Sequence, residues 1–194
     1  VRVTTPEEVH RAIDKAREAQ ALWARTTFDV RRSVLRPIQR HVLDHADELC
    51  DLIVRDAGKT RENEMLGEIW PVSEKIRWTV RHGEKHLRPE RVSSGLFVHK
   101  KATIEYHPRG VVGVICPWNY PLQMACWKSA PALATGNSMI FKPSEETPMG
   151  ALKLAEIFVE AGVPAGVFNV VQGAGDVGAW LTHSPDIAKV SFTG

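Results

Sequence analysis

Several features that would narrow the function are scarce or absent in this sequence. Its 194 residues contain only three cysteines, which are too few and too widely spaced for a disulfide framework and fit a reducing compartment. No apolar run approaches the roughly 20 residues needed to span a bilayer, so no membrane-spanning segment is predicted. The formal net charge of +2 is too small to indicate a nucleic acid or a membrane surface as a partner.

The amino terminus lacks a secretory signal peptide. Because the sequence begins at Val1 and not at a methionine, it does not exclude a targeting segment that was removed or is not represented. We expect a cytoplasmic protein, with an organellar location as the alternative. An apolar content of 43% and a charged content of 25% are ordinary for a globular protein. The length allows one large domain, or one and a half small ones, with a substantial core.

The first 94 residues have the apolar periodicity of helices. Thr5-Pro6-Glu7-Glu8 forms a capping box that predicts the start of a first helix, and Asp29 is predicted to cap a second. A third helix is expected from about 47 to 57, ending at Gly58, and a fourth carries the apolar residues from 65 to 80. We interpret residues 1–94 as a helical layer packed on a larger structure.

Between Pro89 and Arg109 the helical periodicity gives way to a different sequence pattern. Phe97-Val98 and Thr103-Ile104-Glu105-Tyr106 are short strand-like runs, interrupted by Lys100-Lys101. Two such strands are marginally stable alone, so we expect them to lie against another sheet.

From Gly110 onward, strand and helix patterns alternate. Strands are predicted near 111–115, 138–142, 167–171 and 188–192, and helices near 122–134, 148–161 and 177–183. This rhythm is typical of an α/β fold, in which helices cover both faces of a parallel sheet. Ligands bind at the carboxyl ends of such strands, so the polar residues that follow them are candidate site residues: Asn119, Lys142, Ser144 and Glu145.

Spacing alone leaves two roles open for each of these groups. The neutral amide of Asn119 can stabilise an oxyanion, but asparagine more often caps a helix. Lys142 and Glu145 suit the hydroxyls of a ribose, since the ammonium donates and the carboxylate accepts hydrogen bonds. A carboxylate there would also repel a 2′-phosphate. The alternative is a solvated Lys–Glu pair in a turn.

A glycine-rich turn follows the third predicted strand. Gly173-Ala-Gly175-Asp-Val-Gly178 fits the G-x-G-x-x-G pattern of pyrophosphate-binding turns. That pattern normally follows the first strand, and the nearest later acid, Asp186, is too close to be the usual ribose partner. A plain strand-to-helix turn is the alternative.

Two histidine pairs are spaced four residues apart, His41/His45 and His82/His86. Neither has the glutamate of an H-E-x-x-H motif or a third ligand nearby, so no metal site is predicted. Solvated helix faces explain both pairs.

The sequence resembles the NAD(P)-dependent aldehyde dehydrogenases over nearly its whole length. Four signatures stand in that family's order and spacing: Pro117-Trp-Asn-Tyr-Pro121, Lys142-Pro-Ser-Glu145, Glu160-Ala-Gly-Val-Pro164 and Ser191-Phe-Thr-Gly194. Two further segments look closest to the betaine-aldehyde and aminoaldehyde branches, Trp127–Leu133 and Phe168–Gly173.

The resemblance implies roles for individual residues. Asn119 would be the oxyanion-hole donor, and Pro117 and Trp118 would shape the wall between nicotinamide and substrate. Lys142 and Glu145 would hold the adenosine ribose, which favours NAD over NADP. The glycine-rich turn would pass beside the adenine, with the phosphates nearer the carboxyl end of the chain. The remaining residues assigned to the cofactor site are Ile115, Cys116, Ser144, Gly173, Gly175, Phe192, Thr193 and Gly194.

The resemblance also implies the organisation of the chain. Residues 1–94 would be the helical layer of the NAD-binding domain, and 95–109 a β-arm that reaches a neighbouring subunit of a homo-oligomer. Residues 110–194 would be the first half of a doubly wound, Rossmann-like sheet. The family's nucleophilic cysteine and general-base glutamate would fall beyond Gly194, in a catalytic domain that is absent here. We therefore expect this chain alone to be inactive on aldehydes.

The cysteines present have other expected roles. Cys50 and Cys126 occupy apolar helical positions and are predicted to be core residues. Cys116, at a strand end, is the one that could face a cleft and act as a nucleophile. A different class of function, a non-catalytic nucleotide-binding or oligomer-assembly module, is the alternative for the whole chain.

Overall fold

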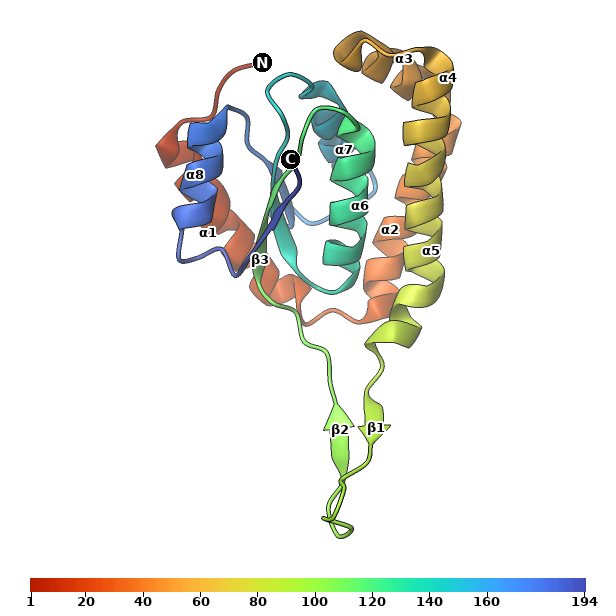
Figure 1. Ribbon diagram of the computed structural model, residues 1–194, viewed down its shortest axis with the longest axis vertical. Coiled ribbons are helices and arrows are strands. Elements are labelled where there is room, and N and C mark those ends of the chain that lie inside the picture. The colour runs from red at the N-terminus through yellow and green to blue at the C-terminus, as the bar shows by residue number, and fades with distance from the viewer.

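A parallel sheet organises the structure, a computed structural model that describes all 194 residues (Figure 1). Its strands are β3 (Val111–Ile115), β4 (Ser138–Lys142), β5 (Phe168–Val170) and β6 (Lys189–Phe192), in the order β5-β4-β3-β6. Numbered along the chain, this is the order 3-2-1-4 with which the doubly wound nucleotide-binding fold begins. The predicted α/β class and the four predicted strands are confirmed.

Helices cover both faces of this sheet, as predicted. On one face lie α6 (Pro121–Ala134) and α7 (Met149–Glu160), and on the other lie α8 (Gly175–His183) and α1 (Pro6–Trp23) (Figure 1). β3 and β4 are buried along almost their whole length, because a parallel strand between two helical layers has no face in water.

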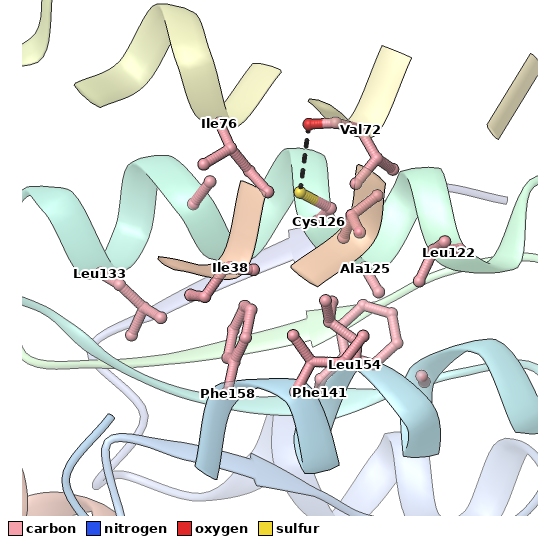
Figure 2. Packing of buried hydrophobic residues seen from close by; sticks show 14 of the residues in the cluster. Ile38, Val72, Ile76, Leu122, Ala125, Cys126, Leu133, Phe141, Leu154 and Phe158 are labelled. Atoms are coloured by element: carbon pink, nitrogen blue, oxygen red, sulfur yellow. Dashed lines mark hydrogen bonds between the residues drawn. The ribbon is translucent and has the colours of Figure 1, made fainter. Parts of the chain in front are cut away.

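The larger core joins the sheet to the outer helices. Figure 2 shows Phe141 of β4 and Phe158 of α7 facing Ile38, which comes from α2 (Phe28–Asp44). Cys126 of α6 lies against Val72, with its Sγ 3.9 Å from that residue's carbonyl oxygen (Figure 2). Helices α2, α6 and α7 and the sheet therefore share one continuous apolar interior.

The amino-terminal helices begin where capping chemistry allows. The capping box of Thr5 and Glu8 is present at the start of α1, as predicted. The cap of α2 is Thr27, whose Oγ1 accepts a hydrogen bond from Val30 N at 3.4 Å. The prediction that Asp29 caps this helix is therefore wrong. Asp29 lies in the first turn instead, where its charge still favours the helix dipole. Helix α3 (Ala46–Ala57) ends at Gly58 in the left-handed conformation, as expected.

The four predicted amino-terminal helices do not form one layer. Helix α1 packs with α8 on one face of the sheet, whereas α2, α3 and the helix that follows them pack on the side of α6 and α7. None of the helices combines the length and the apolar character needed to cross a membrane.

The predicted fourth helix is interrupted by a π turn. A short α4 (Arg61–Glu64) leads into η1 (Met65–Ile69), a π-helical turn, which continues as α5 (Trp70–Leu87). Within this turn the Trp70 amide donates to the Met65 carbonyl, five residues back. Glu64 and Glu68 are both completely buried beside it.

A two-stranded ribbon projects from the body of the protein (Figure 1). It consists of β1 (Glu90–Val92) and β2 (Ala102–Ile104), which pair antiparallel with each other and with no other strand of the chain. The expectation that these strands lie against another sheet is not met within this chain. Phe97-Val98 is also not a strand. It lies in the connecting turn, where the Phe97 amide donates to the Ser94 carbonyl at 3.2 Å.

Candidate functional site

The candidate site is built where β3, β4 and β6 end side by side. Ile115 at the end of β3 is paired with Lys142 on one side and Phe192 on the other. The chain passes from β3 to β4 and β5 in one direction, and β6 then lies on the opposite side of β3. The strand order therefore reverses between β3 and β6. This topological switch point is where open α/β sheets bind ligands.

Backbone hydrogen bonds continue past the strand ends. The Cys116 amide donates to the Lys142 carbonyl at 3.2 Å, and the Thr193 amide donates to the Ile115 carbonyl at 3.0 Å. Phe192 is 69% exposed at the end of β6. The residues that follow these three strands thus leave the sheet from closely fixed positions.

Asn119 lies in the loop that joins β3 to α6. Residues 118–120 are all exposed. Helix α6 begins after Tyr120, and neither Tyr120 nor Asn119 makes a side-chain capping hydrogen bond to its first turn, so Asn119 does not serve as a helix cap. Its backbone carbonyl accepts a hydrogen bond from Lys59 Nζ. The backbone of Asn119 is therefore held, while its side-chain amide makes no hydrogen bond within the chain.

Cys116 differs from the expectation that it could face a cleft. It is only 4% exposed, and burial raises the pKa of its thiol to about 11. The thiol is therefore protonated near neutral pH and unsuited to attack a carbonyl. Cys50 and Cys126 are fully buried, which confirms their prediction as core residues. Burial raises the pKa of both, to about 12 for Cys126.

Lys142, the last residue of β4, forms a defined pair with Glu145, three residues later. Lys142 is 5% exposed, and its Nζ donates to Glu145 Oε2 at 3.1 Å. The side chain of Glu145 is half-exposed. A hydrogen bond from its own backbone amide, together with that of Lys142, lowers the pKa of this carboxyl. The half-exposed carboxylate of Glu145 is therefore ionised near neutral pH, and it is paired with a lysine that is almost completely buried. Ser144 Oγ accepts from the Glu146 amide at 3.3 Å and closes the turn.

The glycine-rich turn follows β5, at the border of the sheet, with β4 and β3 between it and β6. Gly173 has a positive φ of 149°, and a Cβ there would lie 2.4 Å from Val177 Cγ2. The glycine is thus required by the packing of the turn against α8, which begins at Gly175. Its place beside an adenine stays a prediction.

A buried acidic pair beside the Asn119 loop was not predicted. Glu68 Oε2 accepts from the Gln123 amide at 2.5 Å, and Glu64 Oε1 lies 3.3 Å from Lys59 Nζ. Burial raises the pKa of Glu68 to about 8. Two glutamates four residues apart, within a stripe of apolar residues, are the sequence signal that could have indicated this feature.

One hollow of the structure lies away from these residues. Its volume is about 870 Å³, and its lining includes Arg31, Arg109 and Lys128 but none of Asn119, Lys142 and Glu145. No group of three or more histidine, cysteine, aspartate and glutamate side chains is placed as metal ligands would be.

Comparison with known proteins gives a consistent result. The sequence model of the aldehyde dehydrogenase family matches residues 1–194. An E. coli NADP-dependent enzyme is 39% identical, with a TM-score of 0.93 over 100% of this chain. An indole-3-acetaldehyde dehydrogenase is 35% identical and superposes with the same TM-score of 0.93 over 100% of the chain. Succinate-semialdehyde dehydrogenase from Burkholderia pseudomallei is 34% identical, with a TM-score of 0.93 over 100%.

These solved structures are much longer than this chain. It spans 40% of the E. coli enzyme, 46% of the indole-3-acetaldehyde dehydrogenase and 40% of the Burkholderia enzyme.

Proposed function

Because this chain belongs to the aldehyde dehydrogenase family, we propose that it takes part in oxidising an aldehyde to a carboxylic acid with NAD. The observation that carries the proposal is the position of Asn119. Its amide is exposed, is not used as a helix cap and stands beside the switch point of the sheet. A neutral donor fixed at such a place suits a carbonyl oxygen that gains negative charge during the reaction.

In this proposal the chain supplies binding and electrostatic stabilisation. The Asn119 amide donates to the carbonyl oxygen of the substrate as a tetrahedral centre forms. Pro117 and Trp118, which precede it in the same loop, would shape the wall between the substrate and the nicotinamide. The nucleophile and the general base of the family mechanism are assigned to none of the residues of this chain.

The donor and acceptor groups beyond β4 fit a dinucleotide. When bound, NAD supplies the nicotinamide ring that accepts a hydride from the substrate carbon. Lys142 donates to ribose hydroxyls and Glu145 accepts from them, which is the complementary pair that a diol requires. The phosphates are expected near Thr193 and Gly194, after β6.

The preference for NAD over NADP is proposed from charge. The lowered pKa of Glu145 keeps its carboxylate ionised at neutral pH, and an ionised carboxylate repels a 2′-phosphate. The similar E. coli enzyme is NADP-dependent, so members of the family differ in this respect.

Calorimetric titration of the 194-residue chain with NAD and NADP tests the ribose assignment. Glu145→Ala should weaken NAD binding about tenfold, equivalent to about 1.4 kcal/mol, because a hydroxyl acceptor is lost. It should also narrow the preference for NAD over NADP. Glu146→Ala is the matched control, since that exposed glutamate makes no contact with Lys142. Equal losses in the two variants, or no binding by the folded chain, would contradict the assignment.

The ribbon supports a role in assembly. Its tip exposes apolar side chains, with Leu96 at 96% and Val98 at 89% exposure, which would be costly on a permanently free surface. We propose residues 95–109 as an arm that contacts another copy in a homo-oligomer. Residues 1–94 and 110–194 would together form the nucleotide-binding part. We place the protein in the cytoplasm, which three free cysteines support.

A further inference from the structure

The loop that carries Asn119 is held from outside the sheet by one lysine. Lys59 lies just after α3, and its Nζ donates to the Asn119 carbonyl. The same Nζ lies 4.0 Å from the centre of the Tyr120 ring. One ammonium group thus contacts two consecutive residues of the loop, through a hydrogen bond and a cation–π contact.

Buried groups fix the position of Lys59. Its Nζ lies 3.3 Å from Glu64 Oε1, and Glu64 is completely buried. Neither carboxylate oxygen of Glu64 makes a hydrogen bond. The ion pair with Lys59 is therefore the polar interaction that the structure provides for this carboxylate. A buried carboxylate without a countercharge is costly, which favours keeping the lysine at this place.

A second contact fixes the start of α6, directly after the loop. The first turn of α6 has backbone N–H groups without intrahelical acceptors, and its N-cap residue, Tyr120, makes no side-chain capping hydrogen bond. Glu68, from the π turn, takes that part by accepting from the Gln123 amide at 2.5 Å. Gln123 Nε2 returns a hydrogen bond to the Gly67 carbonyl at 2.8 Å. Gly67 also makes room for the loop, because a Cβ there would lie 3.0 Å from Tyr120 Cε1.

We propose that Lys59, Glu64 and Glu68 form a clamp that orients the Asn119 amide for the reaction. The clamp holds the Asn119 carbonyl, the Tyr120 ring and the Gln123 amide, and it makes no hydrogen bond to the side-chain amide of Asn119. These three are positioning residues, since none of them makes a hydrogen bond to the side chain of Asn119. The inference rests on the proposed function, in which the Asn119 amide stabilises the oxyanion.

Kinetics of the complete enzyme that contains this chain test the clamp, using an aliphatic aldehyde and NAD. Lys59→Met keeps the length of the side chain but removes its donors, and should lower kcat about tenfold with the aldehyde KM changed less than twofold. Lys59→Arg should recover most of the lost kcat, because it restores a donor. Lys85→Met, an exposed lysine in the last turn of α5, is the matched control and should behave like the parent.

A double-mutant cycle separates positioning from general packing. In an Asn119→Ala background the oriented amide is gone, so Lys59→Met should lower kcat less than twofold further. A full tenfold further loss would overturn the clamp, because it would mean that Lys59 acts independently of Asn119. Glu64→Gln is a second variant for the case that Lys59→Met unfolds. It removes the negative charge that pairs with Lys59 but keeps the size of the side chain. In the Asn119→Ala background it should likewise lower kcat less than twofold further.

The outcomes also distinguish the two proposals. If Asn119→Ala is as active as the parent, the proposed role of Asn119 fails. If Asn119→Ala is impaired but Lys59→Met and Glu64→Gln are not, the proposed function stands and the clamp is overturned.

Discussion

Asn119→Ala is expected to lower the kcat of aldehyde oxidation by roughly 100- to 1,000-fold in the complete enzyme that contains this chain. That range is typical for removing one oxyanion-hole donor. The loss falls on kcat because the hydrogen bond strengthens as charge develops on the oxygen, and not when the neutral aldehyde first binds. Steady-state kinetics over a range of aldehyde concentrations measures both constants.

The stability of the variant serves as its control. The Asn119 side chain is exposed and caps no helix, so Asn119→Ala should unfold at the same temperature as the parent. Asn119→Asp should be at least as inactive, because a carboxylate repels the developing oxyanion. A loss smaller than about fivefold in Asn119→Ala would remove the residue from the mechanism.

Glu68→Gln is expected to change how the stability of the chain depends on pH. Burial raises the pKa of Glu68 from 4.5 to about 8 in the folded protein, with Glu64 raising it further and Lys59 lowering it. Between these two pH values the folded state holds a proton that the unfolded state releases. The free energy of unfolding therefore falls as pH rises from about 4.5 to about 8, and this contribution is flat above that.

The size of this effect is on the order of 5 kcal/mol at pH 8 and above, from the linkage between pKa and stability. In Glu68→Gln the amide oxygen can still accept from the Gln123 amide and carries no charge. We expect that variant to be the more stable protein at pH 8 and to lose the slope. Urea unfolding at pH 5, 6.5 and 8 measures the slope. Glu62→Gln, an exposed neighbour, should keep the parent's slope. Identical slopes for Glu68→Gln and the parent would contradict this account.

The sequence predicted the sheet well because its strands are short apolar runs ended by proline or glycine. The helix periodicity from 65 to 80 was also correct, but it could not indicate the π turn. In that turn Glu68 accepts a hydrogen bond from Gln123 of α6, 55 residues away, and such a contact leaves no trace in the local periodicity. The sequence did not identify Thr27 as the N-cap of α2, because threonine and aspartate are both common N-cap residues. Only the backbone geometry decides between Thr27 and Asp29.

The sequence likewise predicted some residues of the candidate site and missed others. Asn119, Lys142 and Glu145 could be placed at one edge because each follows a predicted strand, and parallel strands end together. Lys59 could not be assigned to the site from the sequence, because it is 60 residues from Asn119 and belongs to none of the motifs. Which face α1 covers was also outside the reach of periodicity, since an amphipathic helix fits either side of a sheet.

The π turn has a consequence for comparing this chain with other members of its family. An α-helix rotates about 100° per residue, and a π turn accommodates one residue more than an α turn. A relative with a regular helix here would match this chain only if an alignment opened a one-residue gap between Glu64 and Trp70. An ungapped alignment would pair Glu68 with a residue that points about 100° away. Counting acidic residues in such an alignment would then misreport which relatives share the clamp.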